Sequence, residues 1–161
     1  MSTLERMGLE GIAEFIHGPV VIGGSAALVA AGWTCQLHRI PDLFHADPDA
    51  DAFAGARQRR RPPEVMGRLI GLCAPDGFGS SDIPVLSPAA AIADGWIALS
   101  RGWGVHLLDP DDLDPDLIEG AERADLERAL DVLGANARER RDCLAAFGDL
   151  FGEGQEPASL R

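Results

Sequence analysis

The sequence predicts an α/β (α+β) fold: a small mixed sheet of about four strands, flanking helices and a helical C-terminal part. Short apolar runs, some rich in β-branched residues, alternate with segments of helical periodicity and with Gly- and Pro-rich turn signals. The chain has 161 residues, 46% of them hydrophobic, which is enough for one domain with a buried core. The predicted strands are Val20–Ile22, Leu37–Ala46, Arg68–Cys73 and Ile83–Leu86.

The N-terminal segment is predicted to be a helix that leads into the first strand. Residues 2–16 place apolar side chains on one helical face, and Ser2 with Glu5 matches a capping box. After the strand, Ser25 is expected to cap a short helix over residues 26–31.

The middle of the chain is predicted to alternate between helices and strands. A helix is expected over residues 50–60, because its start is acidic and its end is basic. A turn over residues 75–81 would join the third and fourth strands as an antiparallel hairpin. Ser87-Pro88 is a strong helix start, and that helix is expected to run to about Ser100.

The last third of the chain is predicted to be helical. A loop rich in Pro and Asp over residues 109–119 precedes two amphipathic segments, 124–133 and 138–151. The expected division is an α/β core over 1–105, a helical part of the same domain over 106–151, and a flexible tail over 152–161.

Charge and composition exclude several functions. The net charge is −12, and an acidic chain repels nucleic-acid phosphates, so no duplex DNA partner is expected. All 14 basic residues are arginines, which excludes a Walker-type phosphate loop and a Schiff-base lysine. Three widely spaced cysteines favour reduced thiols. No apolar stretch long enough to span a membrane and no signal peptide is visible, so the sequence predicts a cytoplasmic protein with no membrane partner.

The Gly23-Gly24-Ser25 turn is the first candidate binding site. Glycines let a backbone approach a ligand closely, and a helix N-terminus attracts anions, so these residues are candidates for nucleotide binding. The alternative is a tight structural turn, because the third glycine of a dinucleotide fingerprint is absent.

Two carboxylates are candidates for a catalytic or metal-binding role. Asp42 lies on the second predicted strand, and Asp82 lies just before the fourth. A second carboxylate two residues after Asp42 would share its face and complete a metal site, but Phe44 stands there. A salt-bridged residue on the strand is the alternative for Asp42.

A basic cluster is the candidate partner-binding site. It could grip phosphate or an acidic partner, or it could offset nearby negative charge at the end of the predicted helix. The cluster consists of Arg57, Arg59, Arg60 and Arg61.

The order of these features resembles the nucleotidyltransferase-like and AbiEi-type proteins of AbiE toxin–antitoxin and phage-defence systems. The resemblance rests on the run from Val20 to Leu28, then Gly32, Arg39 and Asp42-Leu43, together with the strand-to-helix segment from Ile83 to Asp94. It is a degenerate resemblance, because Phe44 replaces a carboxylate. Only about 19 residues precede the strand that leads into the glycine turn, too few for the winged helix of such antitoxins.

The resemblance implies that the glycine turn would hold triphosphate and that Asp42 and Asp82 would hold magnesium. Because the carboxylate pair is broken, we expect a non-catalytic domain that acts by protein–protein contact, as an antitoxin or phage-defence accessory. Its partner would be another protein, such as a cognate toxin, and a homo-oligomer is left open. The alternatives are a magnesium-dependent nucleotidyltransferase that uses a nucleoside triphosphate, and a generic α/β binding module. No cofactor is expected outside the enzyme alternative.

Overall fold

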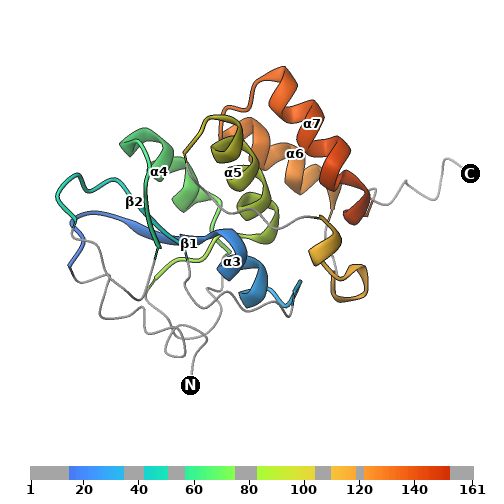
Figure 1. Ribbon diagram of the computed structural model, residues 1–161, viewed down its shortest axis with the longest axis horizontal. Helices are drawn as coiled ribbons and strands as arrows, with labels where there is room; N and C mark the ends of the chain where they lie inside the picture. The colour runs from blue at the N-terminus through green and yellow to red at the C-terminus, as the bar shows by residue number, and fades with distance from the viewer. Residues whose placement is uncertain are drawn as a thin grey trace, which may run out of the picture.

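A computed structural model describes residues 15–34, 42–50, 57–74, 83–103, 110–118 and 122–152. It confirms the predicted α+β class: helices pack on a three-stranded mixed sheet (Figure 1). The strands are β1 (Val20–Gly23), β2 (Asp42–His45) and β3 (Arg57–Arg60). The α-helices are α3 (Gly24–Ala30), α4 (Pro63–Gly71), α5 (Pro88–Ser100), α6 (Arg123–Val132) and α7 (Ala137–Phe147). The described residues also form the short 3-10 helices η1 (Pro110–Asp112), η2 (Pro115–Leu117) and η3 (Gly148–Leu150).

Strand β2 lies between the other two strands. It pairs antiparallel with β1, so that Gly23 faces Asp42, and parallel with β3, so that Asp42 faces Arg57. Every residue of β1 and β2 is buried, whereas β3 is half-buried to exposed. Strands β1 and β2 are therefore shielded from water, whereas β3, next to β2, is polar and rich in arginine.

The fourth predicted strand is present only as a short extension of the sheet. The Ile22 backbone N–H donates to the Pro84 carbonyl at 2.9 Å, and the Leu86 N–H donates to the Ile22 carbonyl at 2.9 Å. Val85 thereby forms an isolated parallel bridge with Ile22, and Leu86 forms an antiparallel one with Cys73.

The third predicted strand is wrong. Residues 68–71 belong to α4, which begins with Pro63 in its first turn and buries Met66 and Leu69. A proline in the first turn is compatible with a helix, and the apolar residues fit a single helical stripe. The apolar run from Arg68 to Cys73 is too short to distinguish the roughly 3.6-residue period of a helix from the two-residue period of a strand.

The helix predicted over residues 50–60 is also wrong where it can be compared, because Arg57–Arg60 is a strand. Its pairing with β2 supplies backbone hydrogen bonds that no local pattern reveals. Other predictions lie outside the described residues: most of the 2–16 helix, the 75–81 turn, Asp82 and the tail after Gly152.

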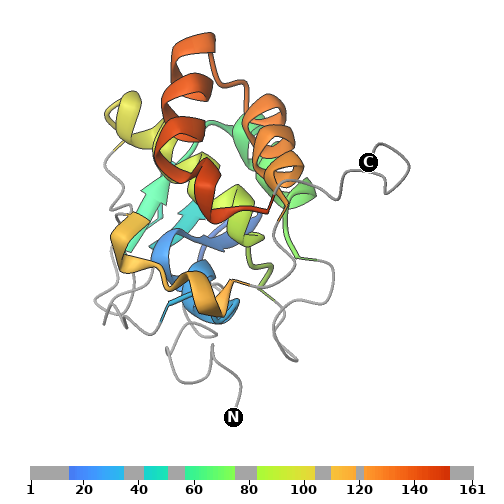
Figure 2. The same ribbon diagram turned by 90° about the vertical axis from the view of Figure 1, so that its right-hand side faces the viewer.

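Helix α5 follows its prediction closely. The Ser87 hydroxyl accepts the Ala90 backbone N–H at 3.3 Å, and Pro88 occupies the first turn. Nearly the whole helix is buried, because it packs against α3 near the sheet and against α6 and α7 on the other side (Figure 2). It thus lies between the sheet and the C-terminal helices, in the middle of the core.

The two C-terminal helices are present as predicted, although α7 ends at Phe147. A capping box starts α7: the Asn136 side chain accepts the Glu139 N–H at 2.8 Å, and the Glu139 carboxylate accepts the Asn136 N–H at 3.0 Å. Among the described residues, no helix is long and apolar enough to cross a bilayer.

Candidate functional site

The glycine turn packs directly against the side chains of β2. A Cβ atom added to Gly23 would lie 2.0 Å from Cε2 of Phe44. Gly24 has a φ of +59°, and a Cβ there would lie 2.7 Å from Oδ2 of Asp42. The two glycines are therefore required by the chain's own packing. Ser25 is buried and does not cap α3, which contradicts its predicted capping role.

Asp42 lies beside this turn and is paired with an arginine. Its Oδ1 is 3.6 Å from Nε of Arg59, whose side chain is 29% exposed while that of Asp42 is 3% exposed. Asp42 and Phe44 are two residues apart on β2, so they share a face of the sheet. The structure thus brings Asp42 to the glycine turn, with a guanidinium as its neighbour. Within the described ranges, no group of three His, Cys, Asp or Glu residues could hold a metal ion.

Arg61 is buried, so it is not the surface residue that the basic cluster suggested. It is 1% exposed, and it forms a two-pronged ion pair with Asp94 of α5. Its Nε lies 3.3 Å from Oδ1 and its Nη2 lies 3.1 Å from Oδ2. The guanidinium carbon also lies 4.4 Å from the Phe44 ring centroid and 5.2 Å from that of Trp103. Arg61 therefore joins the sheet to α5.

The other three arginines of the cluster lie on β3. Arg57 and Arg59 are half-buried and alternate with Gln58, so they share a face of the sheet. Arg60 is exposed, and its Nη2 donates to the Pro48 carbonyl at 2.9 Å. The cluster is therefore a basic strand and not the end of a helix.

A second arginine connects the buried ion pair to α7. Arg101 donates from Nε and Nη2 to the two carboxylate oxygens of Glu139, at 3.2 and 3.1 Å. Its guanidinium carbon lies 5.4 Å from the Trp103 ring centroid, so Trp103 is contacted by both Arg61 and Arg101. Burial alone would raise the pKa of Glu139, but the hydrogen bonds from Arg101 and Asn136 outweigh it and lower that pKa.

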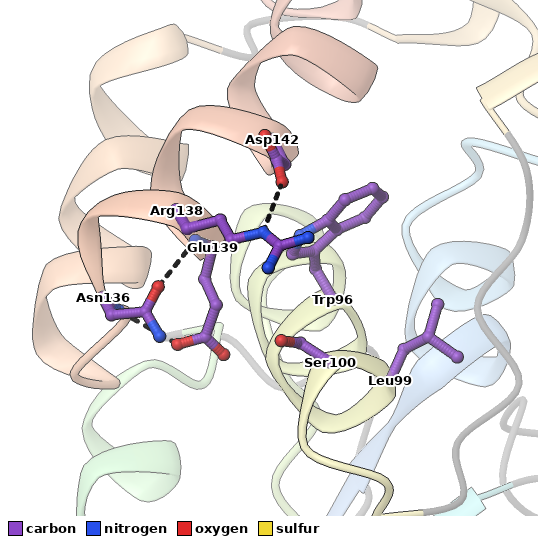
Figure 3. A pocket seen from close by; sticks show the side chains of 7 residues that line it. All are labelled: Trp96, Leu99, Ser100, Asn136, Arg138, Glu139 and Asp142. Atoms are coloured by element: carbon purple, nitrogen blue, oxygen red, sulfur yellow. Dashed lines mark hydrogen bonds and ion pairs between the residues drawn. The ribbon is translucent and has the colours of Figure 1, made fainter.

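An open hollow of about 420 Å³ lies where α5 ends and α7 begins (Figure 3). Trp96, Leu99 and Ser100 line it from α5. Residues of α7 and its cap line the other wall: Asn136, Arg138, Glu139 and Asp142. The α5 side is mainly apolar and the α7 side is charged, a mixture suited to contact with a protein surface.

The loop after β2 is closed by a histidine and an aspartate. Nδ1 of buried His45 accepts the Asp47 backbone N–H at 3.1 Å. The Asp47 carboxylate accepts the backbone N–H groups of His17 and Asp49, both at 2.9 Å, and these bonds hold the pKa of Asp47 below its usual value. Burial lowers the pKa of His45 below 6.5, although the Asp47 carboxylate opposes this. Asp47 thus links the start of β1 to the end of β2.

His45 makes the stability of the domain sensitive to acid. A base whose pKa falls on folding stabilises the folded state above its unfolded pKa of 6.5, and this contribution is lost as the pH falls through the lowered folded pKa. We expect the urea unfolding free energy to decrease on acidification below pH 6.5. His45→Asn, which keeps an acceptor for Asp47 but does not titrate, should flatten this dependence. An equally steep decrease in the variant would show that other groups cause it.

The described cysteines are not candidate nucleophiles. Burial raises the pKa of Cys73 to about 11 and that of Cys143 to about 12. Both thiols are therefore protonated at neutral pH, and the thiolate is the reactive form.

Sequence reasoning missed Asp94, Arg101, Trp103 and Glu139. Asp94 had a detectable signal: it is the only charged residue of α5, amid the apolar side chains of that helix. A buried carboxylate needs a cationic partner, and in a chain without lysine that partner must be an arginine or a histidine. Only the folded structure shows that this partner is Arg61, which lies 33 residues away in the chain.

Comparisons with known proteins identify no family. No protein-family model and no curated protein matches the chain. Among solved structures, it is similar to the crystal structure of the RV2827C protein from Mycobacterium tuberculosis, with 17% sequence identity and a TM-score of 0.49. The match covers 95% of this chain and 58% of that one.

Proposed function

We propose that this chain is a non-catalytic, nucleotidyltransferase-like domain that acts by protein–protein contact, as an antitoxin or phage-defence accessory. The observation that carries the proposal is the ion pair between Asp42 and Arg59 beside the glycine turn. In an active site, a metal ion would neutralise the carboxylate; here the Arg59 guanidinium does so.

Packing at the turn supports the same proposal. The Asp42 carboxylate lies so close to Gly24 that even a methyl group would overlap it. The Asp42 side chain therefore occupies space beside the turn that a phosphate group bound there would need. Magnesium is usually held by one or two protein carboxylates plus substrate phosphates, and the buried ring of Phe44 replaces the second carboxylate.

The second candidate is a magnesium-dependent nucleotidyltransferase. The proximity of Asp42 to Gly24 favours it, because a metal ligand and a phosphate-binding turn would lie side by side in such an enzyme. In that case the partly exposed Arg59 would have to move away, and Asp82 would have to supply a further ligand.

Calorimetry separates the two candidates. We expect no heat of binding when Mg²⁺ alone, or a preformed complex of Mg²⁺ with a nucleoside triphosphate, is titrated into the chain, because Arg59 already compensates Asp42. Asp42→Asn is the matched variant, since it removes the charge and keeps the size. Micromolar Mg²⁺ binding by the wild-type chain that is lost in Asp42→Asn would contradict the proposal and support the enzyme.

Co-expression tests the contact itself. If the product of a neighbouring gene arrests growth, this chain should relieve the arrest, and Asp42→Asn should relieve it equally. Arg57→Glu with Arg60→Glu should weaken relief, because these two side chains are the predicted contact residues that the buried ion pairs do not use. Relief that is lost in Asp42→Asn while the fold is retained would indicate catalysis.

A further inference from the structure

We propose that the hollow between α5 and α7 is the self-association surface of this chain, and that its occupant is a second copy related by a two-fold axis. The inference goes beyond the proposed function, and neither depends on the other. It rests on an exposed apolar group, on a self-complementary pair of charges and on the local charge balance.

The apolar group is at the end of α5. Leu99 is 58% exposed, and Trp96, one turn earlier, is partly buried against Phe147 with ring centroids 5.9 Å apart. An exposed leucine beside a tryptophan, on a helix that is otherwise almost entirely buried, presents an anchor of the type found at the centre of interfaces.

The charges are on the first turns of α7. Arg138 and Asp142 are one helical turn apart, with side chains 84% and 43% exposed, and Arg138 Nε lies 3.7 Å from Asp142 Oδ2 (Figure 3). The rest of the guanidinium fork makes no hydrogen bond to the described residues. A two-fold axis between these positions would place each Arg138 opposite the Asp142 of the partner copy, as a self-complementary interface requires.

The local charge balance favours a copy of this chain over other occupants. The chain carries a net charge of −12, so two copies repel each other over most approaches. Around the hollow, the acidic side chains of Glu139 and Asp142 are matched by Arg101, Arg138 and Arg141. Two copies therefore meet here without facing acidic surfaces, whereas a strongly basic partner would be drawn to acidic parts of the chain instead.

Sedimentation of single and mixed variants tests the proposal. At about 100 µM, where a dimer of micromolar Kd is populated, the wild-type chain should sediment at about twice its 17.1 kDa. Leu99→Arg should weaken the dimer by about tenfold or more. Arg138→Glu and Asp142→Arg should each be monomeric at this concentration. An equimolar mixture of the last two should dimerise again, because the two substituted side chains would face each other as one ion pair and the two unchanged ones as the other.

Matched controls keep the test specific. Val132→Arg introduces the same side chain at an exposed apolar position of α6, and Arg128→Glu reverses a charge on the exposed face of α6. Both should leave the dimer unchanged, and circular dichroism should show the native helix content in every variant. A wild-type monomer at this concentration would overturn the proposal and leave the hollow to another occupant. A dimer insensitive to all three hollow variants, or a mixture that stays monomeric, would overturn it as well.

Discussion

Asp94→Ala is expected to destabilise the domain by about 3–5 kcal/mol, because it leaves the Arg61 guanidinium buried without its counter-charge. The two hydrogen bonds from Arg61 to Asp94 would be lost together, at a site where Arg61 is only 1% exposed to bulk water. The Phe44 and Trp103 rings would still face the cation, but they cannot neutralise it. Urea denaturation monitored by circular dichroism measures the effect.

Two further variants define the cause. Glu127→Ala breaks the half-exposed ion pair with Arg123 on α6, which is expected to cost less than about 0.5 kcal/mol. Arg61→Met combined with Asp94→Leu removes both buried charges and replaces them with apolar groups, so much of the lost stability should return. If the double variant were as unstable as Asp94→Ala, the loss would come from packing and not from the unpaired charge.

Gly23→Ala is expected to cost about 3 kcal/mol, at the upper end of the usual range for overpacked cores. The new Cβ would lie 2.0 Å from Cε2 of Phe44 and 3.0 Å from Cδ1 of Leu86, and both side chains are fully buried. Gly23 has a φ of −138°, an ordinary extended value, so the cost is a clash and not backbone strain. The unfolding free energy again reports it.

A glycine-to-alanine change should instead raise the unfolding free energy where the added Cβ meets no neighbouring atom. Gly67→Ala lies within α4, where an added Cβ has no neighbour within 4 Å, and it should stabilise the domain by up to about 1 kcal/mol.

The double variant Gly23→Ala with Phe44→Leu tests the cause of the clash. Its loss of unfolding free energy should be smaller than the sum of the losses in the two single variants, because the smaller side chain removes the closest contact. Additive losses would show that the ring of Phe44 is not the cause.

Features whose cause is local in the chain could be predicted from the sequence. Ser87-Pro88 contains both the cap and the first-turn proline of α5, and the β-branched run of β1 is an apolar strand by composition. The glycine turn and Asp42 could be chosen as candidate site residues from their residue types alone. Glycines permit close approach of the backbone, and a carboxylate can bind a metal ion or an arginine. Their contact at Gly24 depends on the pairing of β1 with β2, which no local pattern contains.

Features that depend on distant partners could not be predicted. Four residues with three arginines form β3 only because β2 supplies its hydrogen bonds and Asp42 supplies a counter-charge. The sequence of these residues is equally compatible with the basic C-terminal end of a helix. Arg61 has the same residue type as its neighbours, and only the position of Asp94 on α5 makes it a buried residue.

The short segment beside β1 has a consequence for the order of folding. Ile22 is bonded to Pro84 and Leu86, more than 60 positions further along the chain, whereas α6 and α7 contact each other across a short connection. Closing a long loop costs more entropy than closing a short one, and distant contacts slow the search for the native state. The contacts between α6 and α7 can therefore form early, while the pairing beside β1 must wait until the segment before α5 has docked.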